Sequence, residues 1–187
     1  AAPRSGRSCA GTWGSGGLKA SPPVNRGSAG AAAPRAVIRA IERADVAVLS
    51  PGSLFTSTIP ALLGAGVPDA LAAFTGPVVY AANLMTQPGE TAGFTLSDHL
   101  RAITEHIGPM LTDVLVHSEE LPTQLLFRYC GEGAAPVQID RGAIERLGVR
   151  VRRARLLPDA MGAEMRHDPE RLALAVREIA AAGRLAR

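Results

Sequence analysis

Residues 77–82 read Pro-Val-Val-Tyr-Ala-Ala, and residues 83–91, which follow directly, read Asn-Leu-Met-Thr-Gln-Pro-Gly-Glu-Thr. The first stretch is an apolar run of the length of a strand that is buried on both faces, as in parallel sheets. The second is a polar loop that Pro88 stiffens and Gly89 turns. Ligands bind beyond the carboxyl ends of strands in open α/β sheets, so this junction predicts a parallel sheet and a ligand-binding loop.

Predicted strands and helices alternate along the rest of the chain. Strands are expected over residues 46–49, 77–82, 113–117, 136–139 and 149–157. Helices are expected over residues 36–44, 54–63 (bent near Pro60), 67–74, 95–107, 122–129, 140–147 and 169–182. The expected N-caps are Thr95 or Ser97, Asp140 and Asp168. This alternation indicates βαβ units and a mainly parallel α/β sheet.

Charge is unevenly distributed along the chain. Residues 1–35 contain five basic residues and no acidic residue, and the whole chain carries +3, so residues 36–187 carry −2. Basic residues are mixed with acids after residue 35, which excludes nucleic acid as a partner of this region. Residues 1–35 are rich in Gly, Ala, Ser and Pro without apolar periodicity, which predicts a disordered tail before a domain over 36–187.

The composition fits an ordinary globular protein, with 47% hydrophobic and 20% charged residues among 187. Cys9 and Cys130 are too few and too far apart for a disulfide framework or a zinc site. No apolar run is long enough to span a membrane, and no secretory signal is visible. The cytoplasm is therefore the expected location.

The turn after the first predicted strand is a candidate anion site. It reads Ser50-Pro-Gly-Ser53 and opens a helix, whose first N–H groups attract anions. Gly52 would allow close backbone approach, and Ser53 adds a hydroxyl. A Gly-Ser turn before a helix is also a common cap with no further role, so both interpretations stay open.

The loop over residues 83–91 is the more specific candidate. Asn83 and Gln87 carry amides that can pair with a base or a sugar. Thr86 can donate to a phosphate, and Glu90 can hold a hydroxyl or a metal ion. The alternative is that Asn83 and Thr86 bond the backbone of their own loop.

Three residues outside these loops complete the candidate set. Asp98 is either a ligand-binding residue or an acid favoured by the dipole at a helix start. Tyr129 is either a group that stacks on a ring-bearing ligand or a core tyrosine with an exposed hydroxyl. Arg166 suits a phosphate because its guanidinium is planar, and capping by Asp168 does not explain its presence.

Four motifs occur in a recognisable order and spacing: Ser50-Pro-Gly-Ser-Leu-Phe-Thr-Ser57, Asn83–Thr91, Ser97-Asp-His99 and Arg166-His-Asp-Pro169. Together they resemble the gluconeogenesis factor (YvcK) branch of the CofD-like family, named after 2-phospho-L-lactate transferase of coenzyme F420 biosynthesis. The resemblance runs from about Ala36 to Gly183, and residues 83–91 are its most specific element. It implies a Rossmann-like fold with helices on both faces of the sheet.

The resemblance also implies a bacterial regulatory factor, not necessarily catalytic, that binds UDP-N-acetylglucosamine and acts in carbon metabolism, cell shape and wall synthesis. Tyr129 and Arg166 match positions that contact the nucleotide sugar, whereas Ser53, Asn83, Thr86 and Asp98 match its pocket motifs. No catalytic residue or resident cofactor is implied, and a homo-oligomer stays open. One alternative is a transferase of the 2-phospho-L-lactate type that uses a divalent metal, for which Asp98 and Glu90 are the clustered carboxylates. Another is a non-functional product of a damaged gene.

The sequence departs from the family pattern in two places. The family begins with a strand, a Gly-rich phosphate loop and a large N-terminal half, none of which is recognisable here. We therefore expect a fold that is incomplete at its N-terminus, from a fragment or a frameshifted translation, with an exposed apolar strand near residues 46–49. Pro169 stands where many relatives carry Thr, which removes a phosphorylation site.

Overall fold

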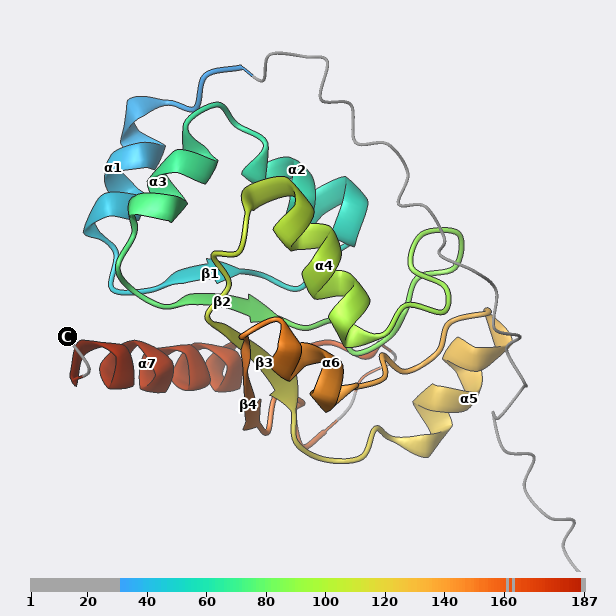
Figure 1. Cartoon of the computed structure of the whole chain (residues 1–187). Coiled ribbons are helices and arrows are strands. Elements are labelled where there is room, and N and C mark those ends of the chain that lie inside the picture. The colour runs from blue at the N-terminus through green and yellow to red at the C-terminus, as the bar shows by residue number, and fades with distance from the viewer. Residues whose placement is uncertain (1–30, 161, 163, 186–187) are drawn as a thin grey trace, which may run out of the picture.

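The computed structural model describes residues 31–160, 162 and 164–185. Its elements are α1 (Arg35–Arg43), β1 (Ala47–Leu49), η1 (Leu54–Thr58), α2 (Ile59–Leu62), α3 (Val67–Ala73), β2 (Val78–Ala81), α4 (Leu96–Ile107), β3 (Asp113–His117), α5 (Thr123–Gly131), α6 (Arg141–Arg146), β4 (Arg150–Ala154) and α7 (Pro169–Leu185) (Figure 1). In the described part of the chain, no helix combines the length and the apolar character that a membrane span requires.

The strands form one parallel sheet in the order β1-β2-β3-β4. Every residue of β2 and β3 is buried, as their apolar sequences predict for inner strands of a parallel sheet. The register places Leu49 opposite Tyr80 and Ala81 opposite Leu115. The carboxyl ends of β1, β2 and β3 therefore lie side by side, and the loops that follow leave from one edge of the sheet.

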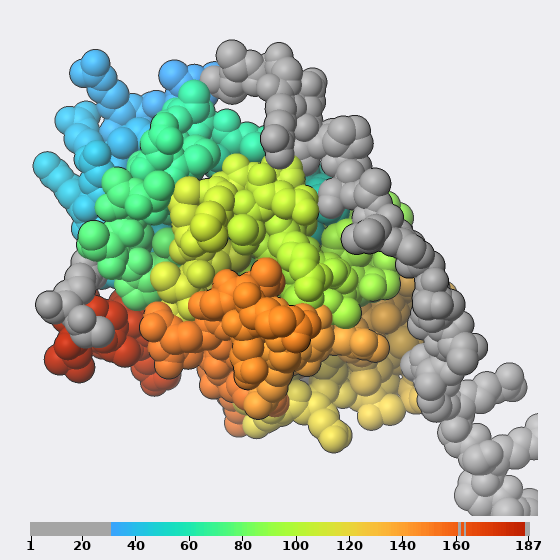
Figure 2. Space-filling view, in the orientation of Figure 1, coloured from blue at the N-terminus to red at the C-terminus, as the bar shows by residue number. Residues whose placement is uncertain are grey.

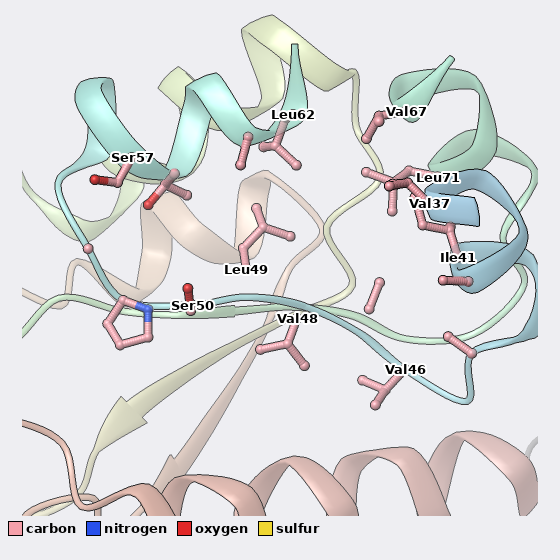
Figure 3. A pocket seen from close by; sticks show the side chains of 17 residues that line it. Val37, Ile41, Val46, Val48, Leu49, Ser50, Ser57, Leu62, Val67 and Leu71 are labelled. Atoms are coloured by element: carbon pink, nitrogen blue, oxygen red, sulfur yellow. The ribbon is translucent and has the colours of Figure 1, made fainter. Parts of the chain in front are cut away.

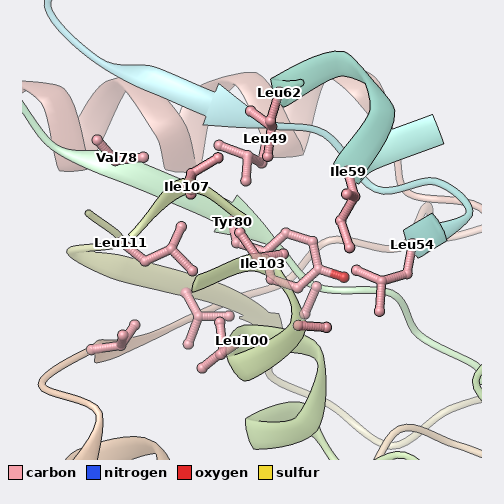
Figure 4. Packing of buried hydrophobic residues seen from close by; sticks show 14 of the residues in the cluster. Leu49, Leu54, Ile59, Leu62, Val78, Tyr80, Leu100, Ile103, Ile107 and Leu111 are labelled. Atoms are coloured by element: carbon pink, nitrogen blue, oxygen red, sulfur yellow. The ribbon is translucent and has the colours of Figure 1, made fainter. Parts of the chain in front are cut away.

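Most of the helices cover one face of this sheet. Figure 2 shows α1, α3, α4 and α6 next to one another on the outer surface of that layer. The core beneath is aliphatic except for Tyr80, whose ring lies among Leu54, Ile59, Leu100 and Ile103 (Figure 4). These five side chains are fully buried. An aliphatic core is the expected consequence of an aromatic content of only 4%.

One long helix, α7, covers the opposite face. Ala175 and Ile179 of α7 pack against Val79 and Leu115 of the sheet. The Oδ1 atom of Asp168 accepts the N–H groups of residues 170 and 171 at 2.9 and 3.0 Å, which confirms its predicted role as N-cap. With helices on both faces of a parallel sheet, the predicted Rossmann-like architecture is confirmed.

Two local predictions were wrong. Residues 136–139 form no strand and make only isolated bridges, from Pro136 to Met85 and from Gln138 to Thr95. Asp140 does not cap its own helix with its side chain. Instead it accepts hydrogen bonds from the N–H and the hydroxyl of Ser97, at 2.9 and 2.6 Å, at the start of α4. The segment therefore fastens α6 to α4 and does not extend the sheet.

The N-cap of α4 is one of the two predicted residues, whereas the end of the predicted disordered tail takes part in the fold. Thr95 is the N-cap of α4 and forms a capping box with Asp98. Residues 31–35 belong to the segment predicted to be disordered, yet Ala33 donates to the Ala65 carbonyl at 3.0 Å and α1 begins at Arg35. The rest of that predicted tail, residues 1–30, lies outside the described residues.

A buried carboxylate joins β3 to β4 at the amino ends of the strands. Asp113 is fully buried and accepts hydrogen bonds from Arg150 at 3.1 and 2.9 Å, from Arg152 at 2.7 Å and from Thr112 at 2.7 Å. Burial alone would raise the pKa of this carboxyl, but the hydrogen bonds outweigh it and hold the pKa below its ordinary value. The carboxylate is therefore charged at neutral pH.

We expect the double substitution of Arg150→Ala and Arg152→Ala to lower the free energy of unfolding at pH 7 by about 3–5 kcal/mol, because it leaves a buried carboxylate without a cation. Urea denaturation measures this loss. The matched control removes two exposed arginines, Arg146→Ala and Arg177→Ala, and should cost about 1 kcal/mol or less. Similar losses for the two pairs would contradict a stabilising role for the Asp113 cluster.

Candidate functional site

An open cleft of about 680 Å³ lies beyond the carboxyl ends of β1 and β2. Its walls are residues 50–53 after β1, residues 83–85 and Gln87 after β2, Tyr129 of α5, and residues 165–167 with Pro169 and Leu172 at the start of α7. This volume is typical of small-molecule sites, and the position is the one at which α/β sheets bind ligands. Six of the nine predicted site residues line it: Gly52, Ser53, Asn83, Gln87, Tyr129 and Arg166.

Asn83 holds two walls of the cleft together. Its Nδ2 donates to the Gly52 carbonyl at 2.8 Å, and its Oδ1 accepts the Gly52 N–H at 3.1 Å. Both polar atoms of the Asn83 amide are thus bonded to the protein's own backbone. Internal bonding was the predicted alternative to ligand pairing, but it was expected within the loop over residues 83–91. The partner, Gly52, belongs to the neighbouring loop after β1. A Cβ on Gly52 would make only an ordinary contact of 3.5 Å with Ser57, so the packing there does not require glycine.

The predicted anion site at the start of η1 is filled by the protein's own carboxylate. Glu90 Oε1 accepts the Ser53 hydroxyl at 2.5 Å and the Phe55 N–H at 3.2 Å. Ser53 Oγ in turn accepts the Thr56 N–H at 3.2 Å and contacts the hydroxyl of Thr56. The N–H groups of Ser57 and Thr58 bond the Ser53 carbonyl. The N–H groups of residues 55–58 are therefore satisfied within the protein, the first by Glu90 and the other three by Ser53.

Thr86 and Asp98, like Glu90, are not part of the cleft wall. Thr86 is buried, and its N–H and hydroxyl bond the backbone of Ala135 at 2.7 and 2.9 Å. Asp98 accepts the Thr95 N–H at 3.0 Å and pairs with Arg101 at 2.8 Å. The structure thus gives both residues positioning roles and favours the helix-start interpretation of Asp98.

The far wall of the cleft comes from α5 and from the segment before α7. The Tyr129 hydroxyl accepts the Met165 N–H at 3.1 Å, which ties α5 to that segment. Arg128 lies over the Tyr129 ring, 5.1 Å from its centre. The side chain of Arg166 is 80% exposed and pairs with Glu164 at 2.5 Å. Its guanidinium is therefore placed at the rim of the cleft, where a negatively charged ligand group can reach it.

His167 is a cleft residue that the sequence analysis did not select. Its Nε2 is buried without a hydrogen-bond partner, and its ring bonds the backbone of Ala82 at the end of β2. Burial, and then the nearby His117, hold the pKa of His167 below its ordinary value, against the effect of the Ala82 bond. The neutral ring supports the cleft floor. In the sequence, the signal that could have indicated His167 was its place in the motif Arg166-His-Asp-Pro169.

Two further buried histidines lie near the carboxyl ends of the strands. His117 Nδ1 accepts the Leu156 N–H at 3.0 Å, and His99 Nδ1 bonds the Thr95 carbonyl at 2.9 Å. Burial is the main reason that the pKa of each ring lies below the usual value. The charge of Glu119 opposes this effect at His117, and the charges of Asp98 and Glu90 oppose it at His99. All three histidines are therefore neutral in the folded protein at pH 7.

The cleft offers a free amide at Gln87, a hydroxyl at residue 50, an aromatic ring at Tyr129 and a guanidinium at Arg166, whereas the Ser53 hydroxyl is already bonded to Glu90. These groups can hydrogen-bond a sugar or a base and can neutralise a phosphate. A metal site is not among its features. In residues 31–160, 162 and 164–185, no three His, Cys, Asp or Glu side chains are grouped so that they could hold an ion.

The fold and the cleft define a Rossmann-like α/β protein with its concave surface at the carboxyl edge of the sheet. Residues 18–157 match the family described as 2-phospho-L-lactate transferase CofD, and the chain belongs to that family. The match begins before the boundary at residue 35 that composition predicts, and it ends before α7.

The relatives include proteins named gluconeogenesis factor. The one from Halalkalibacterium halodurans is 45% identical over 113 residues, which are 60% of this chain and 35% of that protein. The one from Bacillus subtilis is 35% identical over 137 residues, 73% of this chain and 43% of that protein. The crystal structure of a UPF0052 family member from Bacillus halodurans superposes with a TM-score of 0.74 at 37% identity, over 78% of this chain and 47% of that protein. The chain thus spans less than half the length of each of these proteins.

We expect Asn83→Ala to lower the free energy of unfolding by about 1–2 kcal/mol, because the N–H and carbonyl of Gly52 lose their partner. Chemical denaturation measures the change. Gln87→Ala removes an exposed amide from the same loop and should change stability by about 0.5 kcal/mol or less. If both variants lose the same amount, the pairing of Asn83 with Gly52 does not hold the loops together.

Stability should fall as the pH is lowered from 7 to 5.5. His99, His117 and His167 have folded pKa values below 6.5, so the unfolded chain takes up protons first and unfolding becomes easier in this range. Urea titrations at several pH values measure the slope, and a variant with both His117→Gln and His167→Gln should show a smaller one. A slope of the opposite sign would mean that these rings are charged in the folded state.

Proposed function

We propose that the cleft binds a nucleotide sugar of the UDP-N-acetylglucosamine type and that the chain belongs to a regulatory factor of carbon metabolism. The observation that carries the proposal is the convergence of residues 50–53, residues 83–85 with Gln87, Tyr129 and Arg166 on one open cleft. These segments are far apart in sequence, and all but Tyr129 belong to three of the four motifs that resemble the gluconeogenesis factor branch.

The chemistry of the cleft supports this ligand class. A nucleotide sugar carries a diphosphate between two polar rings, so it needs a cation, hydrogen-bonding side chains and an aromatic surface. Arg166 supplies a planar guanidinium at the rim, and Gln87 supplies an amide on the opposite wall. Tyr129 supplies the ring. The roles in cell shape and wall synthesis, and a location in the cytoplasm, are part of the same proposal and rest on the family resemblance.

The transferase alternative rests on the family description and has less support from the site. That reaction would place a divalent metal on Glu90 and Asp98, but Glu90 is engaged at the start of η1 and Asp98 at the start of α4. Neither carboxylate belongs to the cleft wall. The residues present therefore do not fit the metal.

Thermal unfolding with added ligand tests the proposal. UDP-N-acetylglucosamine at a hundredfold excess over its Kd should raise the melting temperature by roughly 5–10 °C. Arg166→Ala should weaken binding by about 10- to 100-fold, because a charge-assisted contact to phosphate is lost. Arg177→Ala, an exposed arginine of α7 outside the cleft, is the matched control and should bind normally.

Other ligands separate the alternatives. A rise in melting temperature with a guanosine diphosphate donor and a deazaflavin, and not with UDP-N-acetylglucosamine, would support the transferase. No response to either set of ligands would contradict both functions and would leave the non-functional product.

A further inference from the structure

The two edges of the sheet differ in chemistry. At the first edge, β1 and the residues that flank it, 46 and 50, carry no charge, and an apolar groove of about 500 Å³ lies beside the strand. Figure 3 shows Val46 and Val48 projecting from the side of β1 that is opposite to Leu62. Val48 is 41% exposed, as predicted for an apolar strand near residues 46–49. The last edge, β4, is rich in arginine instead.

The backbone of β4 leaves hydrogen-bonding groups at this edge. Toward β3, the Arg150 N–H donates to the Thr112 carbonyl at 3.0 Å, and the Ala154 carbonyl accepts the Ser118 N–H at 2.9 Å. Successive residues of a strand direct these groups to opposite sides, so the N–H and carbonyl groups of residues 151 and 153 point outward. Within the part of the chain that the structure describes, β4 ends the sheet and no group bonds these outward donors and acceptors.

Three arginines of β4 share one carboxylate. Arg150 and Arg152 lie on the side of the sheet that α7 covers, where both bond the buried Asp113. Their side chains are nevertheless 62% and 41% exposed. Arg153 is exposed on the other side of the strand and donates to the Ser118 carbonyl. Among the described residues, the edge therefore carries more positive than negative charge.

A groove of about 460 Å³ lies on the α6 side of the same edge. Its lining includes Val149, Val151, Arg141 and Glu145. A strand placed beside β4 would alternate its side chains between the two sides of the sheet. Every second side chain would then enter this groove beside Val151, and the side chains between them would lie next to Arg150 and Arg152.

We propose that the β4 edge docks an extended segment of a partner protein in which acidic and apolar residues alternate. The outward backbone groups pair with the segment, as in the addition of a strand to a sheet. Its acidic side chains compensate Arg150 and Arg152, and its apolar side chains fill the groove at Val151. A charged edge opposes pairing with most strands, so it selects a segment of the opposite charge.

Other occupants fit this edge less well. Pairing of two copies of this chain through β4 would place arginine against arginine, and like charges directly opposite one another destabilise a sheet. Residues 1–30 of the chain itself contain no acidic residue. A nucleic acid has negative charge but no peptide groups to pair with residues 151 and 153. The cleft is lined by residues outside β4, so this docking does not depend on the proposed function.

Fluorescence anisotropy with a labelled peptide tests the docking. The probe is acetyl-Glu-Val-Glu-Val-Glu-Val-Glu-amide, titrated with the whole chain at low salt. Replacing every Glu of the peptide by Gln should weaken binding by about tenfold or more, because the attraction to the arginines is lost. Replacing the central Val of the peptide by Pro keeps the charge and should weaken binding equally, because the segment can no longer pair as a strand.

Two variants of the chain locate the site. Val151→Pro removes an outward N–H without touching the bonds to β3, and Arg153→Glu reverses an exposed charge at the edge. Each should weaken binding of the probe by about fivefold or more. Arg39→Glu is the matched control, since it reverses an exposed charge on α1, which leads into β1 at the opposite edge of the sheet. This variant should bind the probe normally.

Hydrogen exchange followed by NMR gives a readout that needs no substitution. Saturating peptide should slow exchange of the N–H groups of Val151 and Arg153 by about tenfold or more, because they become paired. Unchanged exchange at these two groups would overturn the proposal, and so would equal binding of the Pro-containing peptide or of the Arg153→Glu chain. The absence of binding, or tighter binding of a short oligothymidylate than of the peptide, would overturn it as well.

Discussion

Two hydrogen bonds between the Asn83 side chain and the Gly52 backbone determine how the carboxyl edge of this sheet is built. Leu49 lies opposite Tyr80, so the residues three positions further along each strand, Gly52 and Asn83, meet. The planar amide matches both the backbone donor and the backbone acceptor of one residue, Gly52. The loops after β1 and β2 are therefore held at a fixed separation, and the cleft lies over this junction.

The polar residues around the cleft divide into two groups. Those that are buried or half-buried, among them Thr86 and Glu90, bond the backbone or the helix start and fix the loops. Gln87 and Arg166 are exposed and face the cleft. This division has a physical reason, because a buried polar group must find a protein partner, whereas an exposed one bonds water until a ligand replaces it.

Much of the fold followed from the sequence. The apolar run 78–82 predicted an inner parallel strand, and Asp168 with Pro169 predicted the start of α7. The stretch 136–139 also had an apolar pattern, but its residues pack on α4 and on the loop after β2, so tertiary contacts overrode its tendency to form a strand. Asp140 likewise had two helix starts within reach, and only the packing of α6 on α4 selected the distant one.

The sequence by itself determined which segments leave the carboxyl edge of the sheet, because local patterns of apolar and turn residues indicate where each strand lies in the chain and which polar residues follow it. The tertiary structure alone decided which polar side chains remain available to a ligand. That choice depends on the register between strands and on distances between segments tens of residues apart. Glu90 shows the difference. From the sequence, its carboxylate was a candidate ligand-binding group, but in the folded chain it accepts hydrogen bonds from Ser53 and Phe55 at the start of η1.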